Sequence, residues 1–240
     1  MFIRRLNNET FEKIALFIGL ILLTIVFNLL PMLFIGQEAQ TPVAMKWVLS
    51  IAYLALVGFL IFLIGKRYRQ QVTETIRELR FTWKDFGIAL LFFLATRVVA
   101  VLGTLLVQIG TGNTMSANDA ALFATSEQVA AMFPLYFIAF HVAIGLFAPV
   151  MEEIVFRGFF SQYFFKAGNK WLKLVVSSSI FALFHIVYPI EFVSYFALGA
   201  IFYLAYARRG SIKDAIAVHI LNNSLLVLFS VINYLMILFG

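Results

Sequence analysis

Seven long apolar segments constrain the fold of this chain more than any other feature. About 20 apolar residues suffice to cross a bilayer as a helix. The composition agrees, with 62% hydrophobic residues, 12% charged residues and a mean hydropathy of +0.96. The sequence therefore predicts an all-α polytopic transmembrane helical bundle of about seven spans (seven or eight). The segments cover about residues 14–35, 47–65, 85–108, 132–165, 171–188, 191–207 and 212–238.

Two of these segments differ from a simple helical crossing. The basic start of the chain resembles a signal peptide, but the apolar core from Ile14 to Ile35 is too long for one and no A-x-A site follows. We therefore expect a retained first helix. The fourth segment exceeds the length of one crossing, so we expect it either to tilt and project from the membrane or to break near Pro149.

Basic residues are distributed unevenly between the connections. With a cytoplasmic N-terminus, 16 of the 18 Lys and Arg residues fall on the inner side, which leaves Lys46 outside and Arg97 within the third segment. Cytoplasmic loops carry such an excess, so we expect a cytoplasmic N-terminus and an external C-terminus. The inner set is Arg4, Arg5, Lys13, Lys66, Arg67, Arg69, Arg77, Arg80, Lys84, Arg157, Lys166, Lys170, Lys173, Arg208, Arg209 and Lys213.

The connections suggest a division of the chain at residue 84. We interpret residues 66–84 as a basic interfacial helix on the inner leaflet, and residues 110–128 as an external loop. Residues 1–84 then hold two N-terminal transmembrane helices with this basic segment, and residues 85–240 form the functional core. The absence of cysteine excludes disulfides, thiol catalysis and thiolate metal ligands.

Ionisable side chains inside the apolar segments are the strongest functional signal. Each costs about 2.5–3.5 kcal/mol on insertion scales, so each is a functional hypothesis. A lone histidine commonly braces a helix pair, and we interpret His141 in this way. Arg97 has two interpretations, a structural counter-ion to Glu153, which we favour, or a contact for a substrate carboxylate. The full set is Arg97, His141, Glu152, Glu153, Arg157, His185 and His219, with Asn222 and Asn223 as polar neighbours.

Helical spacing separates the roles of the two adjacent glutamates. Glu153 precedes Arg157 by four residues, which is the favoured order for an ion pair on one helix face. Glu152 is rotated by about 100° from Glu153 and is directed elsewhere. We therefore expect Glu153 to be held and charged, and Glu152 to be presented to another group. The same spacing joins two further pairs, Phe181 with His185 and His219 with Asn223.

Distances along the chain predict that Glu152, His185 and His219 lie at comparable depth in the membrane. Glu152 and His185 are each about 16 residues, or about 25 Å, from the turn signal Gly168-Asn169. His219 lies about nine residues, or about 14 Å, from the break before the last helix. We therefore expect Glu152 and His185 to lie level and all three groups to share one site, with tilt absorbing the difference.

Two chemistries suit this set of residues. A carboxylate and an imidazole that share a water can remove its proton, while a second imidazole and an amide stabilise an oxyanion. That arrangement describes amide hydrolysis without a serine or cysteine nucleophile. Alternatively, Glu152, His185 and His219 could bind zinc with an open fourth position.

Three short motifs resemble those of a known family. "EEIVFR" (152–157), "FALFH" (181–185) and "HILNN" (219–223) are similar to the E-E-x-x-x-R, F-x-x-x-H and H-x-x-x-N motifs of the CAAX-protease and bacteriocin-processing family, also called Abi or Rce1-type intramembrane proteases. The resemblance covers about residues 85–238.

The resemblance implies an all-helical intramembrane endopeptidase whose site opens to the cytosol. The family is often labelled metalloprotease, but a metal-free glutamate mechanism has also been argued for it. We expect no required cofactor, with Zn²⁺ as the alternative. The implied site residues are Glu152 and His185 for water activation, His219 and Asn223 for the oxyanion, and Glu153 and Arg157 as supports.

The resemblance also implies a biological setting. Eukaryotic members trim prenylated C-terminal tripeptides, whereas bacterial members are linked to bacteriocin self-immunity, peptide-pheromone maturation and other membrane-protein processing. A short, Phe-rich chain suggests a bacterial plasma-membrane protein. We expect its partners to be the lipid bilayer and a membrane-associated peptide or protein, and not a nucleic acid. A proton- or ion-coupled carrier and a non-catalytic immunity or scaffold protein remain alternatives.

Overall fold

Every regular element in the described part of the chain is a helix, which confirms the predicted all-α class. The computed structural model describes residues 2–33, 40–116, 120, 132–165 and 168–239. The elements are α1 (Phe2–Leu33), α2 (Val43–Gln71), α3 (Glu74–Glu78), α4 (Trp83–Thr111), α6 (Pro134–Val142), the π turn η2 (Ala143–Phe147), α7 (Ala148–Glu153), the π turn η3 (Ile154–Phe159), α8 (Phe160–Tyr163), α9 (Lys170–Leu183), the 3₁₀ turn η4 (Pro189–Glu191), α10 (Phe192–Ala207) and α11 (Ile212–Phe239).

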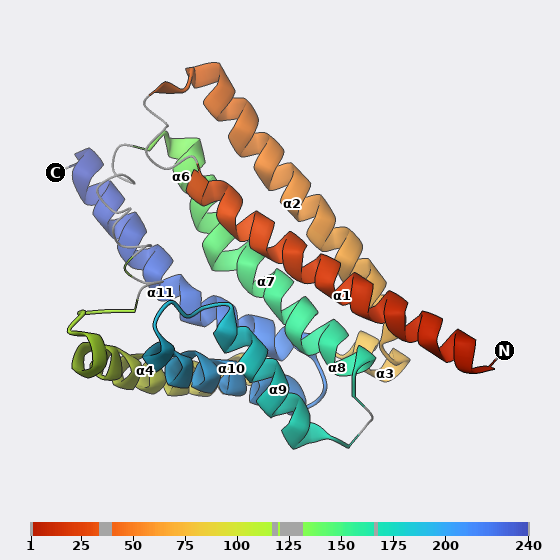
Figure 1. Ribbon diagram of the computed structural model, residues 1–240. Coiled ribbons are helices and arrows are strands. Elements are labelled where there is room, and N and C mark those ends of the chain that lie inside the picture. The colour runs from red at the N-terminus through yellow and green to blue at the C-terminus, as the bar shows by residue number, and fades with distance from the viewer. Residues whose placement is uncertain (1, 34–39, 117–119, 121–131, 166–167, 240) are drawn as a thin grey trace.

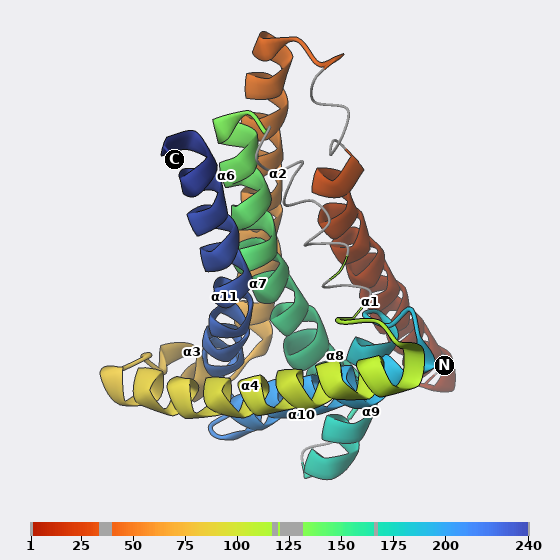
Figure 2. The ribbon, with the colours of Figure 1, turned by 90° about the vertical axis from the view of Figure 1, so that its left-hand side faces the viewer.

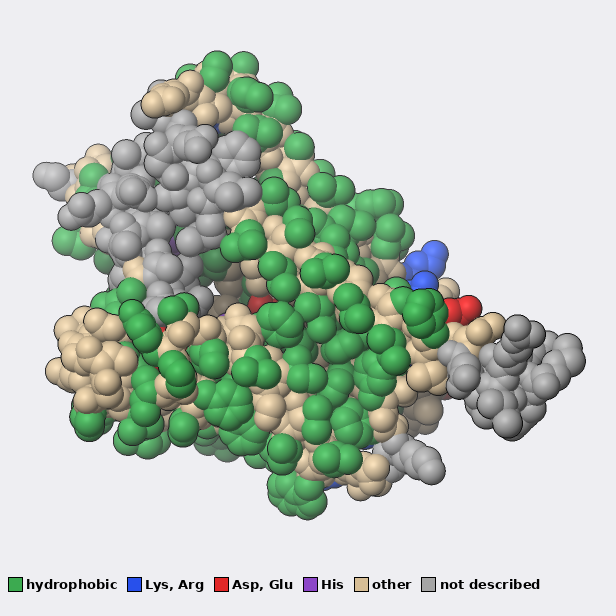
Figure 3. Space-filling view, in the orientation of Figure 1, with side chains coloured by type: hydrophobic (Ala, Val, Ile, Leu, Met, Phe, Trp, Pro, Cys, Tyr) green, Lys and Arg blue, Asp and Glu red, His purple; other side chains and the backbone are tan. Residues whose placement is uncertain are grey.

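Two sets of helices cross each other in the molecule. The helices α1, α2 and α11 and the path from α6 to α8 follow one general direction, and α4 and α10 lie across them (Figures 1 and 2). The helix α10 packs against α4, α9 and α11. Apolar side chains cover much of the face seen in Figure 3, as expected for helices whose backbone polar groups are satisfied internally and whose outer surface meets lipid.

Six helical stretches within the described residues are long and apolar enough to cross a membrane. The predicted span at residues 171–188 is not among them, because α9 ends at Leu183 after 14 residues, or about 21 Å. Among the described residues, six helices are therefore long enough to span alone, and the remaining predicted segment is the shorter helix α9 with the irregular backbone that follows it. The six stretches are Asn8–Pro31, Val43–Gln71, Trp83–Thr111, Pro134–Tyr163, Pro189–Ala207 and Ile212–Phe239.

An irregular segment continues the path of α9 and leads through η4 into α10. The fully buried carboxylate of Glu191 accepts hydrogen bonds from the backbone N–H groups of Val187 (2.8 Å) and Tyr188 (3.0 Å). The turn η4 packs against α4. Non-helical backbone is tolerated at membrane depth only where the protein satisfies its polar groups, and Glu191 does so here.

The fourth predicted segment is one continuous helical path, the central helix (Pro134–Tyr163), so the alternative of a break near Pro149 is not observed. Proline lacks the N–H that would bond the carbonyl four residues earlier, and its ring crowds the preceding turn. Here Pro149 lies in the first turn of α7, directly after the π turn η2. The wider π turn accommodates the proline. A second π turn, η3, follows the paired glutamates.

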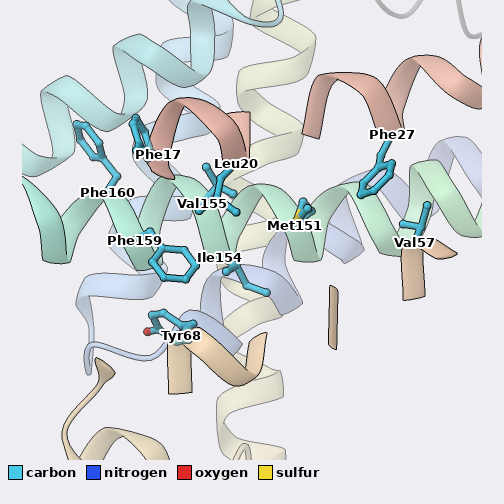
Figure 4. Packing of buried hydrophobic residues seen from close by; sticks show 10 residues of the cluster. All are labelled: Phe17, Leu20, Phe27, Val57, Tyr68, Met151, Ile154, Val155, Phe159 and Phe160. Carbon is cyan, nitrogen blue, oxygen red and sulfur yellow. The ribbon is translucent and has the colours of Figure 1, made fainter. Parts of the chain in front are cut away.

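The helices α1 and α2 both pack against this central helix (Figure 4). The rings of Phe17 and Phe160 lie 5.3 Å apart, and those of Tyr68 and Phe159 lie 6.0 Å apart. Gly158 permits the approach of α2, because a Cβ atom there would lie 2.8 Å from the Tyr68 ring. The helix α7 also packs against α11, and the paired glutamates meet groups from both α1 and α11.

The region 66–84 is not one interfacial helix, which corrects that interpretation. The helix α2 extends into the region, α3 occupies five residues of it, and α4 begins before it ends. Asp85 at the start of α4 forms ion pairs with Arg208 (2.5 Å) and Arg209 (3.1 Å). Both arginines also pair with Asp214, at 2.8 and 2.7 Å. This network fixes the start of α4 to the turn between α10 and α11.

The described ends of the chain are far apart. The beginning of α1 and the end of α11 lie at opposite ends of the helices (Figure 1). Arg157 must be removed from the predicted inner set, because it is fully buried within the central helix. Lys166 and most of the predicted external loop lie outside the described residues.

A reporter of membrane sidedness fused after Gly240 is expected to respond as external, and one fused before Met1 as cytoplasmic. The reason is the excess of basic residues near the cytoplasmic ends of the helices. An alkaline phosphatase and a green fluorescent protein fusion at each end would measure it. The same side at both ends would contradict this topology.

Candidate active site

The paired glutamates end α7, and their carboxylates meet different groups. Glu153 Oε1 lies 3.0 Å from Arg157 Nη1, and both side chains are 0% exposed. This is the ion pair that the spacing of four residues predicts. Glu152 lies one position earlier and faces two imidazoles instead. The predicted division of the two glutamates between different neighbours is therefore the observed one.

The guanidinium of Arg157 is enclosed by α9 and α10. Its Nη2 donates a hydrogen bond to the carbonyl oxygen of Gly199 (2.9 Å). Its Cζ lies 4.8 Å from the ring centroid of Phe181 and 5.6 Å from that of Phe202, distances suited to cation–π attraction. Gly199 brings α10 close to α9, since a Cβ there would lie 3.1 Å from Ser178 Cα. The sequence alone did not indicate this enclosure.

Glu153 also holds His219, which comes from α11. The Nδ1 atom of His219 lies 2.8 Å from Glu153 Oε1, the same oxygen that meets Arg157. The ring of His219 stacks on Phe202 with centroids 4.3 Å apart. One carboxylate oxygen thus connects the central helix to α11, and it fixes the orientation of the imidazole.

Glu152 directs its second oxygen at two histidines. Its Oε2 lies 3.7 Å from Nε2 of His185 and 4.0 Å from Nε2 of His219. Among the described residues this buried oxygen has no hydrogen-bond partner. The predicted meeting of Glu152, His185 and His219 in one site is therefore observed.

His185 lies just beyond α9 and not within a membrane helix. Its Nδ1 is 2.7 Å from the carbonyl oxygen of Phe181, and its ring stacks on that of Phe181 at 4.2 Å and on Tyr195 at 5.4 Å. A carbonyl oxygen can only accept, so Nδ1 carries the proton. In neutral His185, Nε2 is therefore an acceptor, and it faces the carboxylate of Glu152.

Asn223 of α11 and Arg97 of α4 line the same cavity. The side-chain amide of Asn223 donates to the carbonyl oxygen of Ile144 (2.9 Å), and its oxygen accepts from Asn222 (3.1 Å). Arg97 donates to Asn222 Oδ1. The favoured role of Arg97 as a counter-ion to Glu153 is not the observed one, because the ion-pair partners of Glu153 among the described residues are Arg157 and His219, and Arg97 contacts Asn222.

His141 has the geometry of a structural brace, as the sequence predicts. Its Nδ1 lies 2.7 Å from the carbonyl oxygen of Phe137, and its Nε2 lies 2.7 Å from the hydroxyl of Ser230 on α11. These contacts join α6 to α11 without reaching the glutamates.

Several of the predicted site residues line one cavity of about 310 Å³. Figure 3 shows a hollow in the molecular surface, inside which side-chain atoms of Asp or Glu are visible. The mixture of a few polar groups with apolar walls is typical of a ligand site. Polar and ionisable lining residues include Arg97, Glu152, His185, Glu191, His219, Asn222 and Asn223, and apolar ones include Val107, Leu198, Leu225, Leu226 and Phe229.

The first helix supplies a contact that sequence reasoning missed. The side-chain amide of Asn28 donates to Glu152 Oε1 (3.1 Å), across 124 residues of sequence. The available signal was chemical, because Asn28 is a strongly polar side chain inside an apolar segment. No spacing rule connects it to Glu152.

The alternative zinc site is a poor fit to these residues. No group of three or more His, Asp or Glu side chains in the described chain is arranged to hold a metal ion. Ligands at about 2.0–2.1 Å from tetrahedral zinc lie about 3.3–3.4 Å apart, whereas the Glu152 oxygen is 3.7 and 4.0 Å from the two imidazole nitrogens. We assign no catalytic step to a metal.

Residues 134–225 match the sequence model of a family described as Type II CAAX prenyl endopeptidase Rce1-like. This stretch contains all six site residues implied by the three motifs. No solved structure gives a significant match.

Two curated relatives are similar to longer parts of the chain. UPF0177 protein YbdI of Lactococcus lactis subsp. lactis (strain IL1403) is 28% identical over 109 residues, 45% of this chain. Membrane-embedded CAAX protease MroQ of Staphylococcus aureus (strain USA300) is 33% identical over 158 residues, 63% of this chain. Each match spans 58% of the relative's length. Together with the family match, they show that this chain is similar to Rce1-like CAAX endopeptidases.

Glu153→Gln is expected to reduce thermal stability more than Glu152→Gln does. The first change leaves the fully buried Arg157 without its counter-ion, and breaking a buried pair costs about 3–5 kcal/mol. Melting curves of the two purified variants in the same detergent would measure this difference. Equal melting temperatures would contradict the assignment of Glu153 as the structural carboxylate.

Proposed function

Because this chain carries a domain of the CAAX-protease and bacteriocin-processing family, we propose that it is an intramembrane endopeptidase that hydrolyses a peptide bond with activated water. The observation that carries the proposal is the meeting of Glu152, His185 and His219 at one cavity within a helical membrane bundle. Ionisable groups are expensive in that setting, and hydrolysis gives each of them a role.

A water molecule suits the geometry between Glu152 and His185. The carboxylate Oε2 and the unprotonated Nε2 of neutral His185 are both acceptors, and at 3.7 Å they cannot bond to each other. Water has two O–H groups, so it can donate to both at once. The pair therefore binds a water and makes its oxygen more nucleophilic.

The reaction then proceeds in two balanced steps. In the first, a water proton passes to Glu152 Oε2 as the water oxygen bonds to the substrate carbonyl carbon, and the carbonyl electrons move to its oxygen. In the second, the carbonyl re-forms, the C–N bond breaks, and Glu152 returns the proton to the leaving nitrogen. No covalent bond to the enzyme forms, which suits a chain without cysteine.

His219 and Asn223 are positioned to stabilise the developing oxyanion. The Glu153 carboxylate accepts a hydrogen bond from Nδ1 of His219. When His219 carries protons on both ring nitrogens, Nε2 is also a donor and can bond the substrate oxygen. One amide N–H of Asn223 donates to Ile144, and the second N–H remains for the substrate oxygen. Glu153 therefore acts on the reaction through His219.

The substrate fits best as a membrane-associated peptide or protein segment. The walls beside the polar groups are apolar, and the relative from Staphylococcus aureus is named a membrane-embedded CAAX protease. We propose a multi-pass protein of the bacterial plasma membrane that acts in C-terminal CAAX-like cleavage, pheromone maturation or bacteriocin immunity. A comparison of membrane proteomes from cells carrying the wild type or Glu152→Gln would identify the substrate by its accumulation.

Glu152→Gln is expected to fold normally and to lose at least about 10²–10⁴-fold in cleavage rate, because the amide cannot accept the water proton. His185→Ala should lose a comparable factor. Asn223→Ala should retain more activity, since one oxyanion donor contributes about 10²–10³-fold. The measurement is cleavage, in proteoliposomes, of the substrate identified by proteomics. Full activity of Glu152→Gln would contradict the proposal.

Cleavage is expected to survive removal of divalent metals, because the steps above need only protein side chains and water. The test is exhaustive treatment of the purified enzyme with 1,10-phenanthroline, followed by the same cleavage assay. A loss of activity that stoichiometric Zn²⁺ restores would instead make His185 and His219 metal ligands.

A further inference from the structure

The apolar segment of α1 contains two polar side chains capable of strong hydrogen bonds, Thr24 and Asn28. Thr24 is buried and donates to the carbonyl oxygen of Leu20 in its own helix (2.8 Å). Asn28 is itself exposed, as are its sequence neighbours Val26 (49%) and Leu29 (54%). An amide on such a helix face is costly in lipid unless it is hydrogen-bonded.

The Asn28 amide is bonded to the candidate general base. Its Nδ2 lies 3.1 Å from Glu152 Oε1, while the other oxygen of that carboxylate faces His185 and His219. A carboxylate has one free rotation about its terminal bond, and a donor on one oxygen restricts it. The bond to Asn28 therefore favours the rotamer in which Oε2 points at both imidazoles.

Neighbouring contacts hold α1 at the level where this bond forms. Pro31 has no N–H, so the carbonyl oxygen of Phe27 lacks its usual helical donor. The hydroxyl of Tyr53 on α2 donates to that oxygen instead (3.2 Å). The hydroxyl of Tyr136 on α6 donates to the carbonyl oxygen of Pro31. Phe27 itself is buried near Val57 and Met151 (Figure 4), so the segment around Asn28 is fixed by three other helices.

We propose that Asn28 is a positioning residue that orients the Glu152 carboxylate for catalysis, so that α1 is part of the active site although it lies outside the family match at residues 134–225. The proposal rests on the proposed function of Glu152. The other ionisable groups around this carboxylate are Glu153 and Arg157 on the central helix, His185 directly after α9, and His219 on α11. Asn28 is the contact from α1.

Two variants of Asn28 and one matched control test the proposal. Asn28→Leu keeps the approximate volume and removes the donor, whereas Asn28→Gln keeps an amide. Thr24→Val, one turn away on the same helix, removes a polar group that bonds only within α1. The Glu152 carboxylate band is first assigned in infrared spectra of purified protein as the band missing in Glu152→Gln. This spectroscopic readout requires no substrate.

The expected result has a spectroscopic and a kinetic part. The carboxylate band shifts in Asn28→Leu but not in Thr24→Val. In the cleavage assay, kcat of Asn28→Leu falls about 10–100-fold, the factor associated with a lost hydrogen bond to a charged group, while KM and the melting temperature stay near those of the wild type. Asn28→Gln retains a donor and lies closer to the wild type in kcat.

Three results would overturn the proposal. An unshifted band in Asn28→Leu means that Asn28 does not bond Glu152. A shifted band with an unchanged kcat means that the bond does not serve catalysis, and equal kcat losses in the Leu and Gln variants mean that shape, and not the donor, matters. If the wild type cleaves nothing, the proposed function fails and the catalytic role of Asn28 fails with it, while the band shift alone still decides whether the two residues are bonded.

Discussion

The buried ion pair between Glu153 and Arg157 is the interaction on which the rest of the site depends. Two charges without solvent exposure are unfavourable unless hydrogen bonds and favourable contacts compensate for their lost hydration. Here Glu153 also meets His219, and Arg157 also meets the carbonyl of Gly199 and two aromatic rings. The compensation therefore comes from α9, α10 and α11 at once. Because α9 leads directly into His185 and α11 carries the oxyanion groups, the contacts that stabilise this ion pair also assemble the cavity.

The two glutamates show how adjacent residues of one type acquire different chemistry. Glu153 gives one oxygen to Arg157 and to His219, so its charge is held in place. Glu152 is turned away by the rotation of the helix and presents an oxygen to two imidazoles. The π turns on either side of α7 adjust the direction of this short helix relative to its neighbours. Two adjacent residues therefore have separate roles, with Glu153 as the structural support and Glu152 as the reactive group.

Sequence patterns predicted the features that depend on local spacing. Helical lengths follow from apolar runs, and the contact of Glu153 with Arg157 follows from four-residue periodicity. The end of α9 could not be predicted in this way, because hydropathy is equally high in a helix and in buried irregular backbone. The count that placed Arg157 among the cytoplasmic residues is wrong, because the central helix continues through Arg157 and its side chain is buried among the neighbouring helices. The contact of Asn28 with Glu152 joins residues 124 positions apart and depends on how whole helices pack.

The shortness of α9 has a consequence for how the protein enters the membrane. A helix of 14 residues followed by irregular backbone cannot cross the hydrocarbon core alone without leaving polar groups unsatisfied. Glu191 accepts hydrogen bonds from two backbone N–H groups of this irregular segment, and it directly precedes α10. During biosynthesis α9 therefore has to remain in the translocation machinery, or at the membrane surface, until α10 has been synthesised. The two then insert as one helical hairpin, and His185 reaches its depth only as part of that unit.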